Sequence, residues 1–470
     1  MTASRKSKLY FAYLSLISVL LLCVVSFGFF GNAYADIQKT DVIMGTTVEK
    51  GNFPKKDCPS IAANSSIVAD SDGTVYFQRN ADEQVQIASV TKIMTALVAL
   101  EYGDLSSSTV EISKKAAQIG ESTAGLQAGD TMDLTSALKA MMINSGNDAA
   151  QAIAESLGST VKEALASKDG VNQDEIPSSA YDAFIYAMNL KAQELGMTDA
   201  KFCNPHGLDY DQYKGDMQCS ARDVYKMTAA AMQYDTFRSI VKTTKDSISV
   251  TRNNAKATVK LESTDSLLSG KTSCIGVKTG FTNKAGNCFS GAWNWNGKTL
   301  YTIVLGSTSH SQRFDDAQAL YDWVDSHQVD YSLAHASEKI DCTINGTKIS
   351  APVVATVANK AWNDVTFKAT IADPTQKVSV FALSGNISQE ATFDDVSGDV
   401  HVGDKVGTLT FYQHNKEIAH VDIVAAENCA APSFFDGIGI FFGRIASFFG
   451  GQSDQAQSAL LNKTPLLYGE

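Results

Sequence analysis

The sequence lacks an excess of positive charge. Its 470 residues include 39 Lys and Arg against 51 Asp and Glu, a formal net charge of -12 at pH 7. Proteins that bind nucleic acid neutralise phosphates with clustered Lys and Arg, so this balance argues against a nucleic-acid partner. An acidic chain is also repelled by anionic lipid, so attachment to a membrane must be apolar. Hydrophobic residues make up 44% of the chain, a globular composition long enough for two or three domains.

Metal-ligand spacings are missing as well. No Cys-x-x-Cys or His-x-x-x-His pair occurs among the eight Cys and seven His residues, so we expect neither a metal site nor another cofactor. Cys23 lies in the N-terminal apolar run and leaves seven cysteines. Spacing does not fix disulfide connectivity. The favoured pairing leaves Cys58 free. It joins Cys203 to Cys219 and Cys274 to Cys288, which are close in sequence, and Cys342 to Cys429, which bracket the C-terminal domain predicted below.

The N-terminus is typical of a secretory signal. Arg5, Lys6 and Lys8 precede an apolar run over residues 9–30, and small residues follow at Ala33 and Ala35. A basic start, an apolar run and an A-x-A site predict a signal peptide over residues 1–35 that is removed after its last residue. The run is long, so an uncleaved transmembrane anchor is the alternative. In both cases the rest of the chain lies outside the cytoplasm.

The middle of the chain is predicted to form one α+β domain over residues 61–335, preceded by an irregular leader at 36–60. Alternating residues around Ser71-Asp72-Gly73 predict a hairpin, and residues 275–308 predict three strands joined by turns. Helical periodicity lies between them. Strands at both ends and helices in the middle predict an antiparallel sheet that joins both ends of the domain and carries a helical cluster.

The C-terminal third changes character twice. Short alternating segments predict a small all-β, sandwich-like domain over residues 338–429. Residues 432–451 predict an amphipathic helix suited to a membrane interface, followed by a tail at 452–470. Docking of the helix on the protein itself is the alternative. Its apolar residues recur at spacings of three or four: Phe434, Ile438, Phe441, Ile445 and Phe448.

One S-x-x-K pair is distinguished by two motifs that come later in the chain. Ser89 and Lys92 open a predicted helix, "SGN" at 145–147 lies on a loop between two predicted helices, and "KTG" at 278–280 lies on a predicted strand. Ser89 opens its helix after a predicted strand pair, whereas Ser159 comes after the SGN motif. Two further pairs are therefore interpreted as helix surface pairs: Ser159/Lys162 and Ser239/Lys242.

These residue types fit acyl transfer, which needs a nucleophile, a base and a site for the oxyanion. Residues i and i+3 share a helix face, so Lys92 can reach the Ser89 hydroxyl. Lys92 must be neutral to accept a proton. Lowering its pKa from about 10.4 to near 7 takes about 4 kcal/mol, which burial and a second cation, Lys278, can supply.

The remaining motif residues fit substrate handling. Ser145 is placed to relay a proton between the lysines and the leaving amine. Asn147 offers an amide to the substrate backbone. Thr279 and Gly280 suit a strand edge along which an extended peptide lies.

The motifs lie inside longer segments, "NADEQVQIASVTKIMTALVAL", "MMINSGNDAAQAIAE", "FCNPHGLDYD" and "IGVKTGFTNKAGNCFSGA". In the same order, these resemble segments of the D-alanyl-D-alanine carboxypeptidases, the low-molecular-mass penicillin-binding proteins. The resemblance extends from residue 59 to the C-terminal tail. It implies a β-lactamase/transpeptidase-like domain, a serine peptidase that removes the terminal D-Ala of peptidoglycan stem peptides, and acylation by β-lactams. It also implies a place on the outer face of the cytoplasmic membrane, held by the C-terminal helix.

The resemblance further implies residue roles. Ser89 forms the acyl-enzyme, Lys92 is the base, and Ser145 and Asn147 complete the catalytic centre. Backbone N–H groups of Ser89 and Phe281 form the oxyanion hole. Arg313, from "HSQRFDDAQ", joins Thr279 as the clamp for the terminal carboxylate. The substrate-binding residues are Lys278, Thr279, Gly280, Phe281 and Arg313.

Some features depart from the family pattern. Phe281 stands where some members carry His, and residues 167–182 have the character of an insertion. A β-lactamase or a D,D-endopeptidase with the same machinery is an alternative, although no clear E-x-x-L-N segment lies between Ser145 and Lys278. A catalytically silent envelope-binding module is disfavoured because the motif residues are intact. His206 in "NPHGLD" is interpreted as part of a structural turn rather than as an acid or base.

Overall fold

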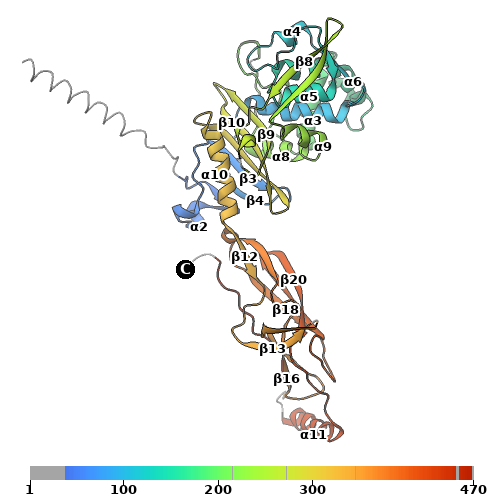
Figure 1. The fold of residues 1–470 in the computed structure, drawn as a ribbon. Coiled ribbons are helices and arrows are strands. Elements are labelled where there is room, and N and C mark those ends of the chain that lie inside the picture. The colour runs from blue at the N-terminus through green and yellow to red at the C-terminus, as the bar shows by residue number, and fades with distance from the viewer. Residues whose placement is uncertain (1–36, 214, 271, 345, 451–454, 468–470) are drawn as a thin grey trace, which may run out of the picture. The chain divides into compact units, whose positions relative to one another are not determined.

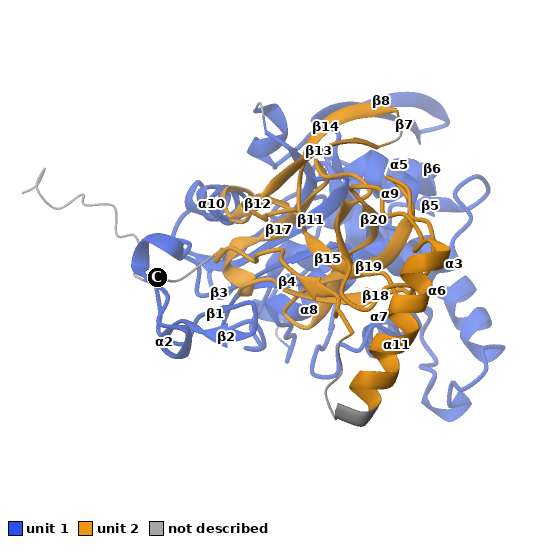
Figure 2. Ribbon diagram, turned by 90° about the horizontal axis from the view of Figure 1, so that it is seen from below, with its two compact units in different colours: residues 1–323 blue, residues 324–470 orange. Residues whose placement is uncertain are grey.

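The chain folds into two compact units, Met1–Trp323 and Val324–Glu470, coloured separately in Figure 2. The computed structural model describes residues 37–213, 215–270, 272–344, 346–450 and 455–467. The predicted signal peptide, residues 1–35, lies outside the described residues.

A seven-stranded antiparallel sheet with the order β2-β1-β4-β3-β11-β10-β9 forms the base of the first unit (Figure 1). Both predicted strand groups are confirmed, and their turns use the expected residues. Gly73 has φ +86°, while Asn296 and Gly297 have φ +47° and +74°, the left-handed backbone of a tight hairpin. The strands are β1 Val42–Ile43, β2 Thr46–Thr47, β3 Ser65–Asp70, β4 Val75–Arg79, β9 Cys274–Thr282, β10 Gly286–Trp295 and β11 Lys298–Ser307.

The segment expected to be an irregular leader instead completes this sheet. Val42 pairs with Gln78 on β4, and β2 forms the edge. Beside the pairing, Arg79 Nε and Nη2 donate to the two carboxylate oxygens of Asp41 at 2.9 and 2.6 Å, with both side chains fully buried. Strands of two residues carry no detectable alternation, which is why the sequence pattern did not predict them.

Helices cover this sheet and surround one buried helix, α3. Every side chain from Lys92 to Ala99 is buried, as expected for a helix packed on several sides; α8 packs on α3 as well as on β3 and β11. The helices are α2 Val48–Gly51, α3 Lys92–Tyr102, α4 Lys114–Ala117, α5 Leu134–Met142, α6 Asn147–Ala166, α7 Ala180–Glu194, α8 Ala221–Ala231, α9 Asp235–Val241 and α10 Gln312–Ser326. A four-stranded sheet adjoins the cluster: β5 Thr109–Glu111, β6 Thr131–Asp133, β7 Lys245–Arg252 and β8 Ala255–Glu262.

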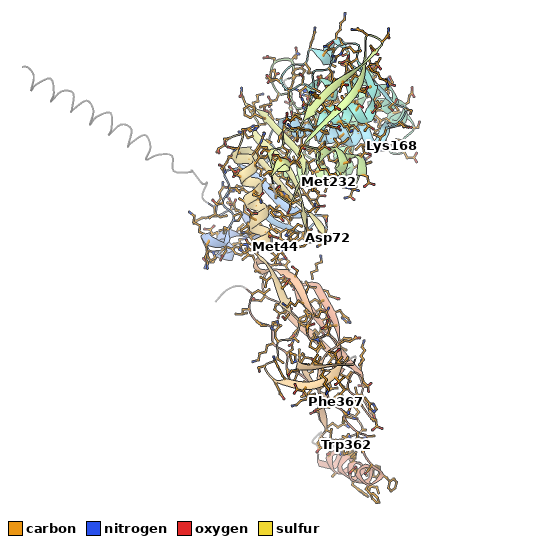
Figure 3. All side chains as sticks on the ribbon, viewed as in Figure 1. Met44, Asp72, Lys168, Met232, Trp362 and Phe367 are labelled. Atoms are coloured by element: carbon orange, nitrogen blue, oxygen red, sulfur yellow. The ribbon has the colours of Figure 1, made fainter. Side chains whose placement is uncertain are left out.

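The second unit is rich in strands. Its main sheet has the order β18-β19-β20-β16-β15-β21, and two further pairs, β12 with β17 and β13 with β14, lie outside it. Its core is apolar and includes Phe367 (labelled in Figure 3), Leu409 and Phe411. Its strands are β12 Gln328–Ser332, β13 Lys339–Ile344, β14 Thr347–Pro352, β15 Ala355–Ala358, β16 Thr366–Ile371, β17 Lys377–Phe381, β18 Ser388–Phe393, β19 Lys405–Gln413, β20 Lys416–Ala425 and β21 Ala459–Leu460.

The C-terminal part contains a helix and a returning strand. Helix α11, Phe434–Gly450, begins after Ser433, whose hydroxyl donates to Asp436 at 2.6 Å. After it, β21 pairs with β15, and the buried Asn462 donates to Leu333 O at 2.8 Å. The stretch taken for a simple tail thus contributes to the second unit. Among the described residues, no helix combines the length and apolar character needed to cross a bilayer.

The favoured disulfide pairing is wrong. All seven described cysteines are free thiols. Cys274 lies opposite Trp293, whereas Cys288 lies opposite Gly280. Gly280 is six residues beyond Cys274, about 20 Å along a strand, so strand register separates two cysteines that are close in sequence.

Candidate active site

Ser89 and Lys92 meet where a tight turn enters the buried helix. Ser89 lies in a 3-10 turn, Ala88–Thr91, and Lys92 is the first residue of α3. This spacing brings Lys92 Nζ to 2.8 Å from Ser89 Oγ. Ala88 has φ +48°, and a Cβ added to Gly207 would lie 1.9 Å from the Ala88 carbonyl oxygen. The glycine of "NPHG" is therefore required for the close packing that fixes the Ser89 turn.

Lys92 is fully buried and has neutral hydrogen-bond partners. Besides Ser89, its Nζ donates to Asn147 Oδ1 at 2.6 Å and to the His206 carbonyl oxygen at 3.0 Å. Burial, reinforced by the charge of Lys278, holds the pKa of Lys92 well below its usual value. A lysine in this state can accept a proton from the serine beside it.

Ser145 and Lys278 form a second pair in the same site. Ser145 lies between α5 and α6 with φ +58°, an unusual conformation for a residue with a side chain. Lys278 Nζ, from β9, donates to Ser145 Oγ at 2.9 Å and to the Thr279 carbonyl oxygen at 2.9 Å. Burial, followed by the charge of Arg313, lowers the pKa of Lys278 to about 7.

Asn147 lines the pocket and also makes two hydrogen bonds within the protein. Its Oδ1 accepts from Lys92, and its Nδ2 donates to the Gly120 carbonyl oxygen at 3.1 Å. The side chain therefore positions the lysine and ties the loop at Gly120 to the start of α6.

Strand β9 brings the KTG motif against the Ser89 turn. A Cβ added to Gly280 would lie 2.8 Å from the Ile87 carbonyl oxygen and 3.1 Å from the Ser89 backbone nitrogen. Only glycine allows this approach. Thr279 Oγ1 lies 2.6 Å from Thr264 Oγ1, and the next side chain, Phe281, is 57% exposed.

Arg313 lies near the start of α10 and reaches the same strand. Its Nη1 donates to the Gly280 carbonyl oxygen at 3.0 Å, and its Nη2 lies 3.1 Å from His310 Nδ1. The side chain is 2% exposed, and burial lowers its pKa to about 10, so it remains a cation at neutral pH. Its contacts within the described residues contain no carboxylate at hydrogen-bond distance, which suits a clamp for a substrate carboxylate.

These residues enclose one pocket of about 380 Å³. Seven of the nine residues predicted from the sequence line it, while Lys92 and Lys278 lie behind Ser89 and Ser145. The structure adds eight lining residues to which the motifs gave no role, because tertiary packing decides which side chains reach the pocket. The added lining residues are Glu121, Ser122, Leu208, Tyr210, Thr264, Thr282, Asn283 and His310.

The remaining candidates lie as interpreted. His206 Nδ1 accepts from the Leu208 backbone at 3.2 Å, so its ring belongs to the local turn, although its carbonyl group contacts Lys92. Lys162 donates to the Ser178 carbonyl oxygen at 2.7 Å instead of to Ser159, and Lys242 is exposed.

Comparison with known proteins points to one family. The family model described as D-alanyl-D-alanine carboxypeptidase matches residues 52–166 and 172–309, and its interruption falls at the start of the predicted insertion. The D-alanyl-D-alanine carboxypeptidase DacF of Bacillus subtilis is 26% identical over 407 residues, covering 83% of this chain and 93% of DacF. A D-alanyl-D-alanine endopeptidase of Pseudomonas aeruginosa is 27% identical over 292 residues, covering 61% and 86%.

A solved structure gives the same result. The Streptomyces K15 DD-transpeptidase superposes with a TM-score of 0.50 at 30% identity, covering 56% of this chain and 97% of the other. The family match spans more than half of the chain and contains every motif residue from Ser89 to Phe281. The chain therefore belongs to the D-alanyl-D-alanine carboxypeptidase family of serine peptidases, the low-molecular-mass penicillin-binding proteins.

Proposed function

We propose that this chain removes the terminal D-Ala of peptidoglycan stem peptides through an acyl-enzyme on Ser89. The observation that carries the proposal is the 2.8 Å contact between Ser89 Oγ and Lys92 Nζ, with the lysine fully buried and its pKa well below its usual value. Lys92 then removes the Ser89 proton as Oγ bonds to the carbonyl carbon of the penultimate D-Ala.

Charge that develops on the carbonyl oxygen is received by backbone N–H groups of Ser89 and Phe281. The close approach of Gly280 to the Ser89 nitrogen supports this assignment, because it brings the two backbones together. As the C–N bond breaks, the proton that Lys92 took from Ser89 passes through Ser145, which contacts Lys278 at 2.9 Å, to the leaving amine, and Lys92 is neutral again. Water then attacks the ester, with Lys92 again as base, and frees the shortened peptide and Ser89.

The terminal carboxylate is held by Thr279 and Arg313. Both line the pocket, and the arginine is a buried cation beside β9. An extended peptide along β9 places its last residue at Arg313 and the preceding carbonyl group at Ser89. β-Lactams acylate Ser89 by the same route.

Release of D-Ala tests the proposal. Purified protein is incubated with a diacylated Lys-D-Ala-D-Ala peptide and, separately, with fluorescent penicillin. We expect release and labelling from the wild type and neither from Ser89→Ala. Ser159→Ala is the matched control, because Ser159 is the exposed serine of another S-x-x-K pair, and its loss should leave both signals intact. Rapid turnover of penicillin without D-Ala release would instead identify a β-lactamase.

A second candidate activity is endopeptidase action on cross-linked peptides, favoured by the relative of that name in Pseudomonas aeruginosa. The same nucleophile attacks the same D-Ala carbonyl group, and only the leaving amine is larger. Digestion of a cross-linked muropeptide dimer, followed by chromatography of monomers, distinguishes the two activities.

We further propose that the exported protein sits on a membrane surface through α11. Residues on one side of this helix are held by the protein: Arg444 donates to Asn363 Oδ1 at 2.9 Å and to the Lys360 carbonyl oxygen at 2.8 Å. Nearby, Trp362 (Figure 3) donates to the Ala430 carbonyl oxygen at 3.0 Å. The apolar side chains stay exposed, with Phe434 at 79% and Phe441 at 60%, as an interfacial helix requires.

Co-sedimentation with liposomes tests this attachment. Replacing Phe434, Phe441 and Phe442 by Ser should abolish binding while D-Ala release in solution persists. The control replaces three exposed polar residues of the second unit. Unchanged sedimentation of the Phe variant would contradict attachment through α11.

A further inference from the structure

The pocket wall carries a negative charge from Glu121 as well as the positive charge of Arg313. Among the pocket-lining residues that the structure describes, Glu121 is the one carboxylate, and Arg313 is the one guanidinium. The two belong to different parts of the pocket wall. Arg313 contacts β9 at Gly280, whereas the loop containing Glu121 is bonded to the start of α6.

The loop that carries Glu121 is held in place by hydrogen bonds on both sides of it. Gly120 O accepts from Asn147 Nδ2 at 3.1 Å, and Ser122 O accepts from the Asn147 backbone at 2.8 Å. Ser122 Oγ donates to the Asn144 carbonyl oxygen at 3.1 Å. Between these anchors Glu121 has φ +57°, a conformation that costs free energy for a residue with a side chain and is maintained by the surrounding contacts.

Tyr210 faces the carboxylate from another segment. Its hydroxyl donates to Glu121 Oε1 at 3.4 Å, and both residues line the pocket. The rings of Tyr210 and Tyr213 form a T-shaped pair with centroids 6.1 Å apart. Tyr213 forms a second T-shaped pair with His206, with centroids 4.9 Å apart. A carboxylate with a tyrosine hydroxyl beside it in the pocket offers an ammonium group both a negative charge and hydrogen-bond acceptors.

The direction of the substrate places a particular residue here. With its terminal carboxylate at Arg313 and the scissile carbonyl group at Ser89, a peptide leaves the nucleophile on the side away from Arg313. Asn147, which contacts Lys92 beside Ser89, holds the loop at Glu121. Tyr210 contacts Glu121, so these lining residues continue the pocket wall from the nucleophile.

We propose that Glu121 and Tyr210 form a subsite for the positively charged side-chain amino group of the residue that precedes D-Ala-D-Ala. The inference rests on the proposed function and adds the substrate class: stem peptides in which this amino group is free. Glu121 is exposed, so the pair is screened by solvent and contributes about a two- to fivefold preference.

Two peptides measure the preference directly. Nα-acetyl-Lys-D-Ala-D-Ala carries a free ammonium group, whereas Nα,Nε-diacetyl-Lys-D-Ala-D-Ala does not. We expect wild-type kcat/KM to be about two- to fivefold higher for the free amine, mainly through KM, and this ratio to shrink at about 0.5 M salt. In Glu121→Gln the ratio falls to about one.

A charge reversal and a matched control sharpen the result. Glu121→Lys should prefer a peptide with an Nε-succinyl group, which carries a carboxylate, over the free amine. Asp211→Asn removes an exposed acid next to Tyr210 that does not line the pocket, and it should keep the wild-type ratio. A wild-type ratio of about one, or the same ratio in wild type and Glu121→Gln, overturns the subsite while D-Ala release upholds the proposed function. Release of D-Ala from neither peptide overturns both.

Discussion

The interiors of the two units differ in what they bury. In the first unit, buried side chains include Lys92, Lys278, Arg313 and the Arg79–Asp41 pair. In the described part of the second unit, the buried polar side chains are neutral: Asn359, Thr370, Ser384, Gln413 and Asn462. Burying a charge costs free energy unless a partner offsets it. The first unit tolerates this cost at the pocket, where depressed lysine pKa values suit acid–base chemistry, whereas the second unit is a strand-rich scaffold without such groups.

Replacing Lys92 by Met should have the largest effect on activity, because it removes a buried lysine of the pocket. We expect acylation by fluorescent penicillin to slow by about 10²- to 10⁴-fold, because the base is lost. The free energy of unfolding should fall by only about 1–3 kcal/mol, because a side chain of similar size fills the space but leaves Asn147 Oδ1 and the His206 carbonyl oxygen without their donor. Stopped-flow labelling and urea titration measure the two quantities. Labelling within tenfold of wild type would exclude Lys92 as the base.

Arg79 is a buried cation that, unlike Lys92, is paired with a carboxylate, that of Asp41. Arg79→Met leaves Asp41 buried without its partner and should lower the free energy of unfolding by about 3–5 kcal/mol. The double variant with Asp41→Leu should recover much of this loss, because it removes the uncompensated charge. Urea titration measures both. A double variant as unstable as the single one would show that the ion pair is not the source of the loss.

The second unit offers an apolar counterpart. Phe411 is fully buried on β19, and Phe411→Ala should destabilise this unit by about 3–5 kcal/mol. Because the pocket residues belong to the first unit, labelling of Ser89 should persist in the folded part. Limited proteolysis followed by fluorescence of the protected fragment checks this, and loss of labelling would mean that the first unit depends on the second.

The sequence predicted the pocket better than it predicted the sheet edge. Ser89, Lys92, Ser145 and Lys278 could be found because fixed spacing on regular elements determines which side chains meet. The hairpin turn at Asn296-Gly297 could be found because its residues favour left-handed backbone.

Other features depend on contacts between distant segments. Asp41 meets Arg79 across 38 positions, and Glu121 meets Tyr210 across 89, so no local pattern reveals them. The separation of Cys274 from Cys288 follows from strand register, which proximity in sequence does not determine. The contact of Asn147 with Lys92 likewise appears only once α3 and α6 are packed together.

The charge of Lys278 should make both the acylation rate and the stability of the first unit depend on pH. Removing its charge in Lys278→Gln should raise the pKa of Lys92, so the ascending limb of the acylation rate moves about one unit to higher pH. The pKa of Lys278 is about 7 in the folded chain and about 10.4 when unfolded. Between these values the unfolded chain binds the extra proton, so wild-type stability rises with pH relative to the variant. Labelling rates and urea titrations across this range measure both effects. An unmoved limb would show that Lys278 does not tune Lys92.

Lys168, labelled in Figure 3, gives the smallest effect because its charge is partly in water. It lies 2.7 Å from Glu194 and 3.4 Å from Glu101, with about a third of its side chain exposed. Solvent screens these ion pairs, so Lys168→Met should change the free energy of unfolding by less than about 1 kcal/mol and leave acylation unchanged. Urea titration at low and high salt measures the difference, which should shrink as salt rises. If Lys168→Met lowered the free energy of unfolding as much as is expected for Arg79→Met, the exposure of an ion pair would not determine how much it stabilises this fold.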